Sequence, residues 1–203
     1  MLFNEKCILC LCDFETTGLN ANNHLPIEIG FYLLDYKFNK LAEYTSLIKW
    51  PEYELLENQE IKRSHILAQQ VHKIDYKTLM TEGKNPSLVV SDMITKFNKF
   101  KPKFGKIILT SDNIRFEWEF MKVLLGDLPI TDVFHYAGWD TSMFLEATKI
   151  GDPTTGVKHR ALDDVAILYK HIVEAKKIVD LGLIASKPSL TNHINTANDG
   201  RNK

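Results

Sequence analysis

The chain has 203 residues, of which 44% are hydrophobic and 25% are charged, a composition typical of one globular domain. Its 25 basic and 26 acidic residues give a net charge of −1, which excludes a strongly basic nucleic-acid coat and a polybasic membrane binder. The longest apolar run, residues 7–12, is far shorter than the ~18 residues of a membrane span. With no signal-peptide pattern either, we expect a cytoplasmic protein without membrane contact.

The first half of the chain begins with predicted strands. Residues 6–15 are apolar on both faces until near their end, which is typical of a strand at the centre of a sheet. Residues 26–36 and 40–50 predict two further strands. Residues 51–85 are polar and irregular, with weak helical signals around 55–71.

Helices and strands alternate in the second half. In chain order we expect a helix from residue 86, a strand at 106–111, a helix at 115–125, a strand within 131–139, a helix at 141–149 and a helix at 160–179. Residues 151–158 form a predicted loop, and residues 186–203 a polar tail that we expect to be disordered. This order predicts an α/β fold with a mixed sheet, in one domain at residues 1–185.

The three cysteines fall in the first predicted strand. Side chains alternate along a strand, so Cys10 and Cys12 share one face and Cys7 takes the other. An odd number cannot pair completely, and this spacing does not supply the four convergent ligands of a zinc site. We expect three buried, reduced thiols, in keeping with a cytoplasmic location.

Two carboxylates end the first predicted strand. Asp13 and Glu15 lie two residues apart, so their side chains share a face and can reach a common cation. The next residues supply two hydroxyl groups, a conformationally permissive position and an exposed apolar side chain. They are Thr16, Thr17, Gly18 and Leu19.

Helical spacing separates two inward acids from their exposed neighbours. In the helix at 115–125, Glu117 lies on the apolar stripe, whereas Glu119 falls among basic residues. In the last helix, Asp164 lies on the buried stripe, whereas Asp163 falls mainly among charged residues. An acid on an apolar stripe is costly unless it meets a partner or a metal, so Glu117 and Asp164 are the functional candidates.

Convergence of these acids would create a site for divalent cations. Each close pair of carboxylates costs about 4 kcal/mol at an effective dielectric near 20, and hard cations such as Mg²⁺ or Mn²⁺ relieve that repulsion. Two such ions ~4 Å apart hold the attacking and leaving oxygens of a phosphoryl displacement. His159 stands five residues before Asp164 and can reach the acids only from the loop that precedes the helix, where its imidazole suits a general base.

These residues resemble the motifs of the DEDDh, or DnaQ-like, 3′–5′ exonucleases. The resemblance covers about residues 6–178, including a second strand similar at Pro-Ile-Glu-Ile-Gly. Glu117 stands where the family usually has Asp, and Asp112 stands where many members carry His. The three motifs are DFETTGL at 13–19, NIRFEWEFM at 113–121, and HRALDD at 159–164.

The resemblance implies an RNase H-like fold, which is a five-stranded mixed sheet flanked by helices. It implies two Mg²⁺ or Mn²⁺ ions, with Asp13 bridging both, Glu15 and Asp164 completing the first site and Glu117 supporting the second. His159 would be the general base.

The resemblance also implies how a nucleotide binds. Backbone amides near Thr16 and Thr17 would hold the terminal nucleotide, and Leu19 would wedge against its base. Lys158 and Arg160 flank the proposed base and are candidates for phosphate contacts. The remaining substrate-binding candidates are Gly18, Asn113 and Phe116.

The leading hypothesis is hydrolysis of the 3′-terminal phosphodiester of single-stranded DNA, which releases nucleoside 5′-monophosphates. The alternatives are an RNA-trimming exonuclease, a catalytically silent nucleic-acid-binding subunit, and a non-nuclease scaffold with incidental acids. A silent subunit requires a lost acid or base, whereas all five positions carry competent groups. Residues 186–203 are a candidate segment for contacting a polymerase or another protein.

Overall fold

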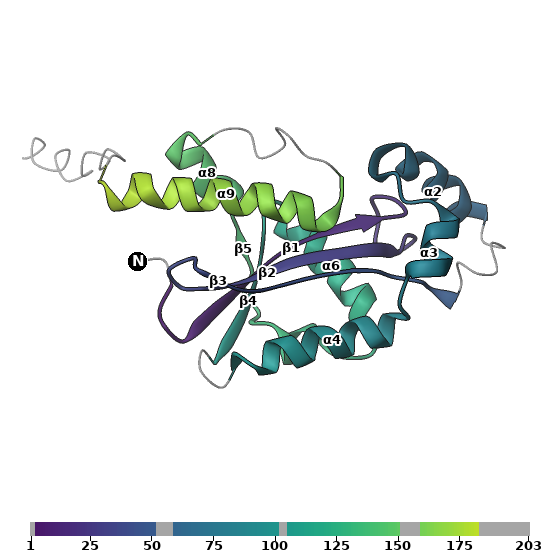
Figure 1. Ribbon diagram of the computed structural model, residues 1–203, viewed down its shortest axis with the longest axis horizontal. Helices are drawn as coiled ribbons and strands as arrows, with labels where there is room; N and C mark the ends of the chain where they lie inside the picture. Colours follow the sequence, from purple (N-terminus) through teal and green to yellow (C-terminus); the bar gives the residue numbers. More distant parts are fainter. Residues whose placement is uncertain (1–2, 52–58, 102–104, 151–158, 183–203) are drawn as a thin grey trace, which may run out of the picture.

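A five-stranded mixed sheet in the order β3-β2-β1-β4-β5 forms the centre of the molecule (Figure 1). The computed structural model describes residues 3–51, 59–101, 105–150 and 159–182. β1, β2 and β3 pair antiparallel, whereas β4 runs parallel to β1 and β5, so the expected mixed sheet is confirmed. The strands are β1 (Cys7–Thr16), β2 (Pro26–Asp35), β3 (Lys40–Leu47), β4 (Lys106–Ser111) and β5 (Trp139–Asp140).

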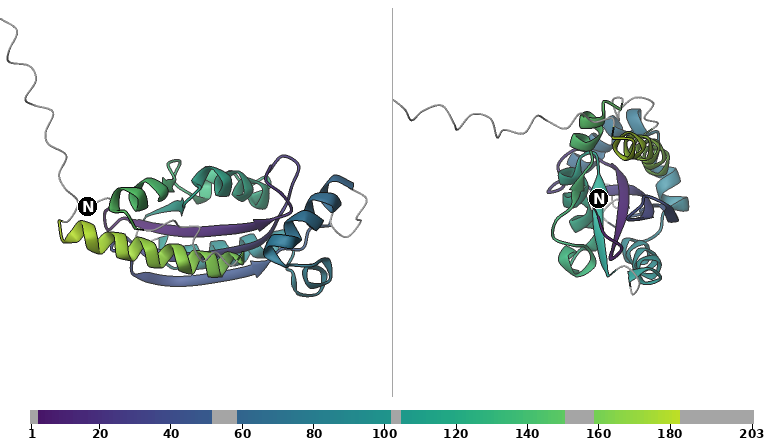
Figure 2. Two further views of the ribbon diagram at one scale, coloured as in Figure 1. Left: turned by 90° about the horizontal axis from the view of Figure 1, so that it is seen from above. Right: turned by 90° about the vertical axis from the view of Figure 1, so that its left-hand side faces the viewer.

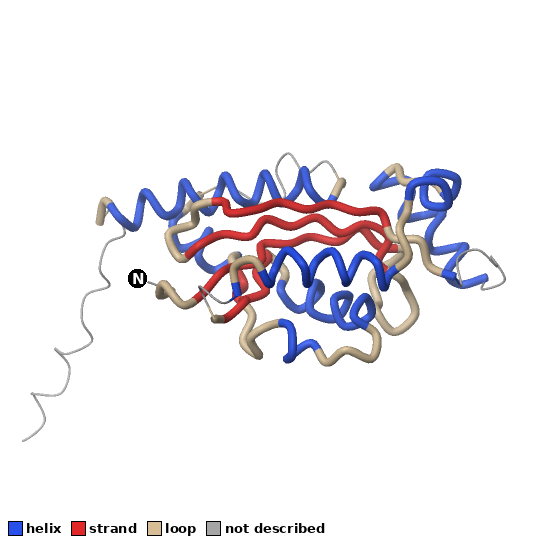
Figure 3. The backbone as a smooth tube through the Cα atoms, turned by 60° about the horizontal axis from the view of Figure 1, so that its bottom comes forward, coloured by secondary structure: helices blue, strands red, loops and turns tan. Residues whose placement is uncertain are grey.

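Helices cover both faces of the sheet and one of its ends. α8 and α9 lie over one face, α4 and α6 over the other, and α2 and α3 lie at the end toward which β1 points (Figures 1, 2 and 3). The described helices are α2 (Gln59–His72), α3 (Tyr76–Glu82), α4 (Pro86–Asn98), α6 (Ile114–Leu125), α7 (Ile130–Val133), α8 (Ser142–Thr148) and α9 (Ala161–Asp180).

β1 separates the two main cores. Cys10 and Cys12 lie in the core shared with α4 and α6, and Cys7 lies in the core shared with α9. All three thiols are free and buried, which confirms the expectation from the sequence. Because side chains alternate, Asp13 and Glu15 continue the α9-facing side of the strand.

The predicted strand within 131–139 is wrong over most of its length. Residues 130–133 form α7, and only Trp139–Asp140 pairs with β4. Pro129 precedes the helix, and Val133 and Phe134 pack into the core instead of alternating along a ladder. β3 is also shorter than expected, since it ends at Leu47; the Ile48 amide still donates to the Ile27 carbonyl at 2.8 Å, and Ile48 forms a bridge with Lys84.

Two predicted segments, the loop at 151–158 and the tail at 186–203, lie outside the residues that the structure describes. Among the residues that are described, no helix is both long and apolar enough to cross a membrane.

Candidate active site

The end of β1 carries the first two acids of the site. Pairing with β4 runs only as far as Leu11, so the last residues of β1 extend past the end of that neighbouring strand. On the other side, Asp13 is opposite Gly30 of β2 and Glu15 is opposite Glu28. The N-terminal ends of α6 and α9 bring further acids to this edge.

α6 places Glu117 inside the protein. Glu117 is 2% exposed, whereas Glu119 is exposed and pairs with Lys122 at 2.8 Å, so the predicted inward and outward placements are confirmed. The pKa of Glu117 is raised from 4.5 to about 8, mainly by burial; the Ser111 hydroxyl acts in the opposite direction, and the charge of Asp112 adds to the effect of burial. One carboxylate oxygen, Oε2, is buried without a hydrogen-bond partner.

α9 supplies Asp164 together with His159, which precedes the helix. The backbone of His159 is left-handed, with φ of 55°, and its amide donates to Asp164 Oδ2 at 2.9 Å. Glu15, His159 and Asp164 each offer a ligand atom, and these atoms lie within 4.8 Å of one another. Asp163 is exposed, whereas Asp164 is half-buried. Asp164 is thus the more buried of the two, as the helical pattern predicts.

Burial, followed by repulsion among the acids, raises the pKa values of the carboxylates in the site. Burial raises the pKa of Asp13 well above its usual range, and the carboxylates of Glu117, Glu15 and Asp164 raise it further. Burial also raises the pKa of Glu15 to about 8, with a further contribution from Asp164. All four acids therefore interact electrostatically, although only Glu15 and Asp164 share the close cluster with His159.

This donor set fits a hard divalent cation. Carboxylate oxygens are the ligands that Mg²⁺ and Mn²⁺ prefer, and mutual repulsion among the acids favours a cation between them. The unpartnered Oε2 of Glu117 offers one more buried acceptor. The residues that could hold such ions are Asp13, Glu15, Glu117 and Asp164, with His159 beside them.

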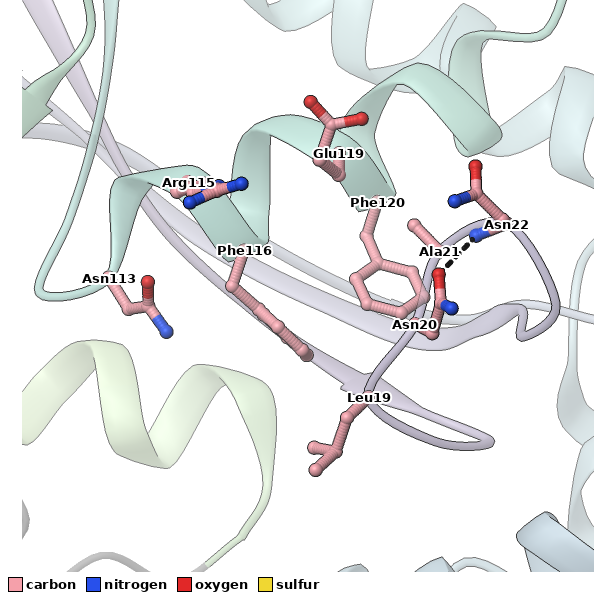
Figure 4. Close-up of a pocket in the computed structure, with 9 residues that line it drawn as sticks. All are labelled: Leu19, Asn20, Ala21, Asn22, Asn113, Arg115, Phe116, Glu119 and Phe120. Atoms are coloured by element: carbon pink, nitrogen blue, oxygen red, sulfur yellow. Dashed lines mark hydrogen bonds between the residues drawn. The ribbon is translucent and has the colours of Figure 1, made fainter.

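A pocket of about 480 Å³ opens between the turn after β1 and the first half of α6 (Figure 4). Phe116 extends from α6 toward Leu19, which is 86% exposed, and Asn113 lines the same space. Three predicted substrate residues, Leu19, Asn113 and Phe116, therefore line one pocket. The sequence did not single out the other lining residues, which are Asn20, Ala21, Asn22, Arg115, Glu119 and Phe120.

The two threonines at the end of β1 mainly support the turn that follows. The Thr17 amide donates to the Leu25 carbonyl at 2.9 Å, and its hydroxyl accepts from the Leu25 amide at 3.0 Å. Thr16 donates its hydroxyl to the Gly18 carbonyl at 2.7 Å. Because the Thr17 amide and hydroxyl are occupied within the chain, the predicted amide contact to a nucleotide would need a different local arrangement.

The two predicted phosphate contacts have different outcomes. Lys158 lies outside the described residues. Arg160 forms an ion pair with Glu28, a buried acid that the sequence analysis noted only within a similar second strand. Glu28 could have been noticed in the sequence for the same reason as Glu117, because an acid within an apolar pattern needs a partner. Here the apolar neighbours are Ile27 and Ile29.

Comparison with known proteins identifies the family and supports the fold. A family model described as Exonuclease matches residues 11–172. Exonuclease I from Methylocaldum szegediense is 20% identical, with a TM-score of 0.54, over 74% of this chain and 31% of that one. The E. coli Exonuclease I complex with a dT13 oligonucleotide is 16% identical, with a TM-score of 0.59, over 86% of this chain and 43% of that one. This chain thus spans less than half of either relative, and no curated protein sequence matches it.

Proposed function

The chain belongs to the exonuclease family, and from that premise we propose that it is a metal-dependent 3′–5′ exonuclease of single-stranded DNA. The observation that carries the proposal is the convergence of Glu15, His159 and Asp164 at the end of β1. Asp13 and Glu117 interact electrostatically at the same place. The reaction is hydrolysis of the 3′-terminal phosphodiester, with release of a nucleoside 5′-monophosphate.

The acids would hold two Mg²⁺ or Mn²⁺ ions. Asp13 would serve both ions, Glu15 and Asp164 would complete the first site, and Glu117 would support the second with its buried Oε2. Such ions would supply positive charge to the phosphate oxygens of the substrate. Glu117 has one methylene group more than the Asp usual in related motifs, and it lies at a buried position on α6.

His159 is the proposed general base. It is exposed at the start of α9, where a water can reach its ring. The bond from its backbone amide to Asp164 holds the residue beside the acids while leaving the ring nitrogens available. The imidazole takes a proton from the attacking water as the water oxygen bonds to phosphorus. The bond from phosphorus to the 3′-oxygen of the preceding nucleotide breaks, and that oxygen leaves as a hydroxyl after it takes a proton from solvent.

The pocket beside Leu19 is the proposed site of the 3′-terminal nucleotide. Phe116 offers a ring for stacking, Leu19 an apolar edge, and Asn113 an amide for hydrogen bonds. Single-stranded DNA is supported as the substrate because the E. coli relative was captured with a dT13 oligonucleotide.

Labelled oligonucleotides test this proposal. Single-stranded DNA and RNA, each labelled at the 3′ or the 5′ end, are incubated with Mg²⁺, Mn²⁺ or EDTA. We expect 3′-labelled DNA to release labelled mononucleotide at once, and 5′-labelled DNA to shorten progressively, only with metal present. Asp164→Asn abolishes both, whereas Asp163→Asn, an exposed acid on the same helical turn, retains them. Release from the 5′ end, or unchanged hydrolysis in Asp164→Asn, contradicts the proposal, and faster RNA cleavage overturns its substrate.

A further inference from the structure

Glu28 is a buried carboxylate on β2 that lies outside the three sequence motifs. Its side chain accepts from Arg160 Nε at 3.0 Å, from Arg160 Nη2 at 2.7 Å and from the Ala161 amide at 3.1 Å. Glu28 is 3% exposed, so these bonds are what compensate a carboxylate removed from water. All three donors stand at the start of α9. The carboxylate therefore fastens the N-terminus of this helix to the sheet.

This ion pair lies next to the acidic cluster. Glu28 is opposite Glu15 in the register of β1 and β2. The positive charge of Arg160 lowers the pKa of Glu15, against the larger effect of burial. Arg160 also follows His159 directly and begins the turn that leads to Asp164. The ion pair between Glu28 and Arg160 is thus connected to Glu15, to His159 and to Asp164.

Gly30 provides a second contact between β2 and α9. A Cβ atom there would lie 2.4 Å from the Leu162 nitrogen and 2.5 Å from the Ala161 carbonyl carbon. The first turn of α9 therefore packs directly against the backbone of Gly30. Gly30 is opposite Asp13, just as Glu28 is opposite Glu15. The two contacts that hold α9 therefore lie across from the two carboxylates of β1.

We propose that Glu28 is a positioning residue, which acts through Arg160 and the start of α9 to hold His159 and Asp164 at Glu15. This inference rests on the proposed function, because those groups are the assigned base and metal ligands. It also gives Arg160 a different role from the phosphate contact that the sequence suggested. A guanidinium fork that bonds a carboxylate through two nitrogens fixes direction as well as distance, which a single charge does not.

A double-mutant cycle tests this role. The variants are Glu28→Gln, Arg160→Met and the double substitution, with Glu43→Gln as the matched control, since Glu43 also forms an ion pair with a basic partner, Lys40, at 2.9 Å on the same sheet. We expect each single change to lower kcat about tenfold or more while KM stays within about threefold. The double variant loses no more than the worse single variant, because both changes remove one interaction. Glu43→Gln keeps the kcat of the parent chain.

A second readout does not depend on turnover. The Mn²⁺ concentration needed for half of the metal-induced rise in melting temperature increases about tenfold or more in Glu28→Gln and Arg160→Met. If the parent chain shows this rise but hydrolyses no oligonucleotide, the proposed function fails while the positioning role is still measured. If Glu28→Gln does not fold, the exposed Arg160→Met carries the test alone.

Three results overturn the inference. The first is a raised KM with unchanged kcat in Arg160→Met, which identifies Arg160 as a substrate contact. The second is losses that multiply in the double variant, because the two residues then act separately. The third is a lower melting temperature with unchanged kcat and Mn²⁺ response in Glu28→Gln, because the ion pair is then merely structural.

Discussion

Replacing Glu117 by Gln should stabilise the metal-free protein, increasingly so as pH rises. Glu117 is buried, and its pKa in the folded chain is about 8, against 4.5 for an exposed glutamate. Between these values the folded state keeps a proton that the unfolded state has lost. Stability contributed by this group is therefore complete below about pH 4.5 and is lost as pH rises through about 8. The amide of the Glu117→Gln variant does not titrate, so the variant lacks this loss.

The size of the effect follows from the pKa. The full difference between 4.5 and about 8 corresponds to about 5 kcal/mol, at ~1.4 kcal/mol for each pH unit. From about pH 5.5 to about pH 7.5 the variant should gain ~3 kcal/mol relative to the parent chain. For a domain of this size that gain is roughly 6–10 °C in melting temperature.

Urea unfolding in EDTA, followed by circular dichroism at about pH 5.5, 6.5 and 7.5, measures this gain. Glu43→Gln is the control, because Glu43 is exposed and its replacement should leave the pH dependence unchanged. Saturating Mn²⁺ should reverse the order of parent and variant, since a bound cation favours the ionised carboxylate that Gln cannot supply. A stability difference that stays constant from acid to neutral pH would refute the burial argument.

Three further changes address the metal site, the helix contact and the pocket. Mn²⁺ at about 100 times its Kd should raise the melting temperature of the parent chain by ~5–10 °C, and Asp13→Asn should abolish that rise in a thermal scan; persistence of the rise contradicts the metal assignment. Gly30→Ala should cost about 3 kcal/mol in urea unfolding, because its Cβ meets backbone of α9 rather than a movable side chain. Leu19→Ala should raise KM for single-stranded DNA about fivefold or more, with an unchanged melting temperature because Leu19 is 86% exposed; an unchanged KM removes Leu19 from the substrate site.

The sequence predicted the sheet well because most strands have a strong local pattern. The first strand is apolar on both faces and lies at the centre of the sheet with both faces buried. The last strand is only two residues long and pairs at the sheet edge, where local sequence has little influence. Its position depends on where the preceding chain is held, including the bond from the His135 amide to the Ile107 carbonyl at 2.7 Å.

The acids of the site were predictable to different degrees. Glu117 and Asp164 stood out because a charge on an apolar helical stripe needs an explanation, and both are turned inward. Glu28 carries the same signal within a buried strand, yet a strand pattern does not show which donors meet it. Those donors come from residues more than 130 positions away in the chain. Only the folded structure shows that pairing.

The motif gives the position of Arg160 in the chain but not the group within the protein that it contacts. A basic side chain next to a proposed base suggests a phosphate contact, because the substrate carries negatively charged phosphate groups. The site already holds several carboxylates, and burial makes the fixed negative charge of Glu28 costly without a cation of its own. The same guanidinium that compensates Glu28 stands at the start of α9. Arg160, whose charge compensates the buried Glu28, thus also holds the start of α9 in place. The proposed base, His159, and the proposed metal ligand, Asp164, depend on that position.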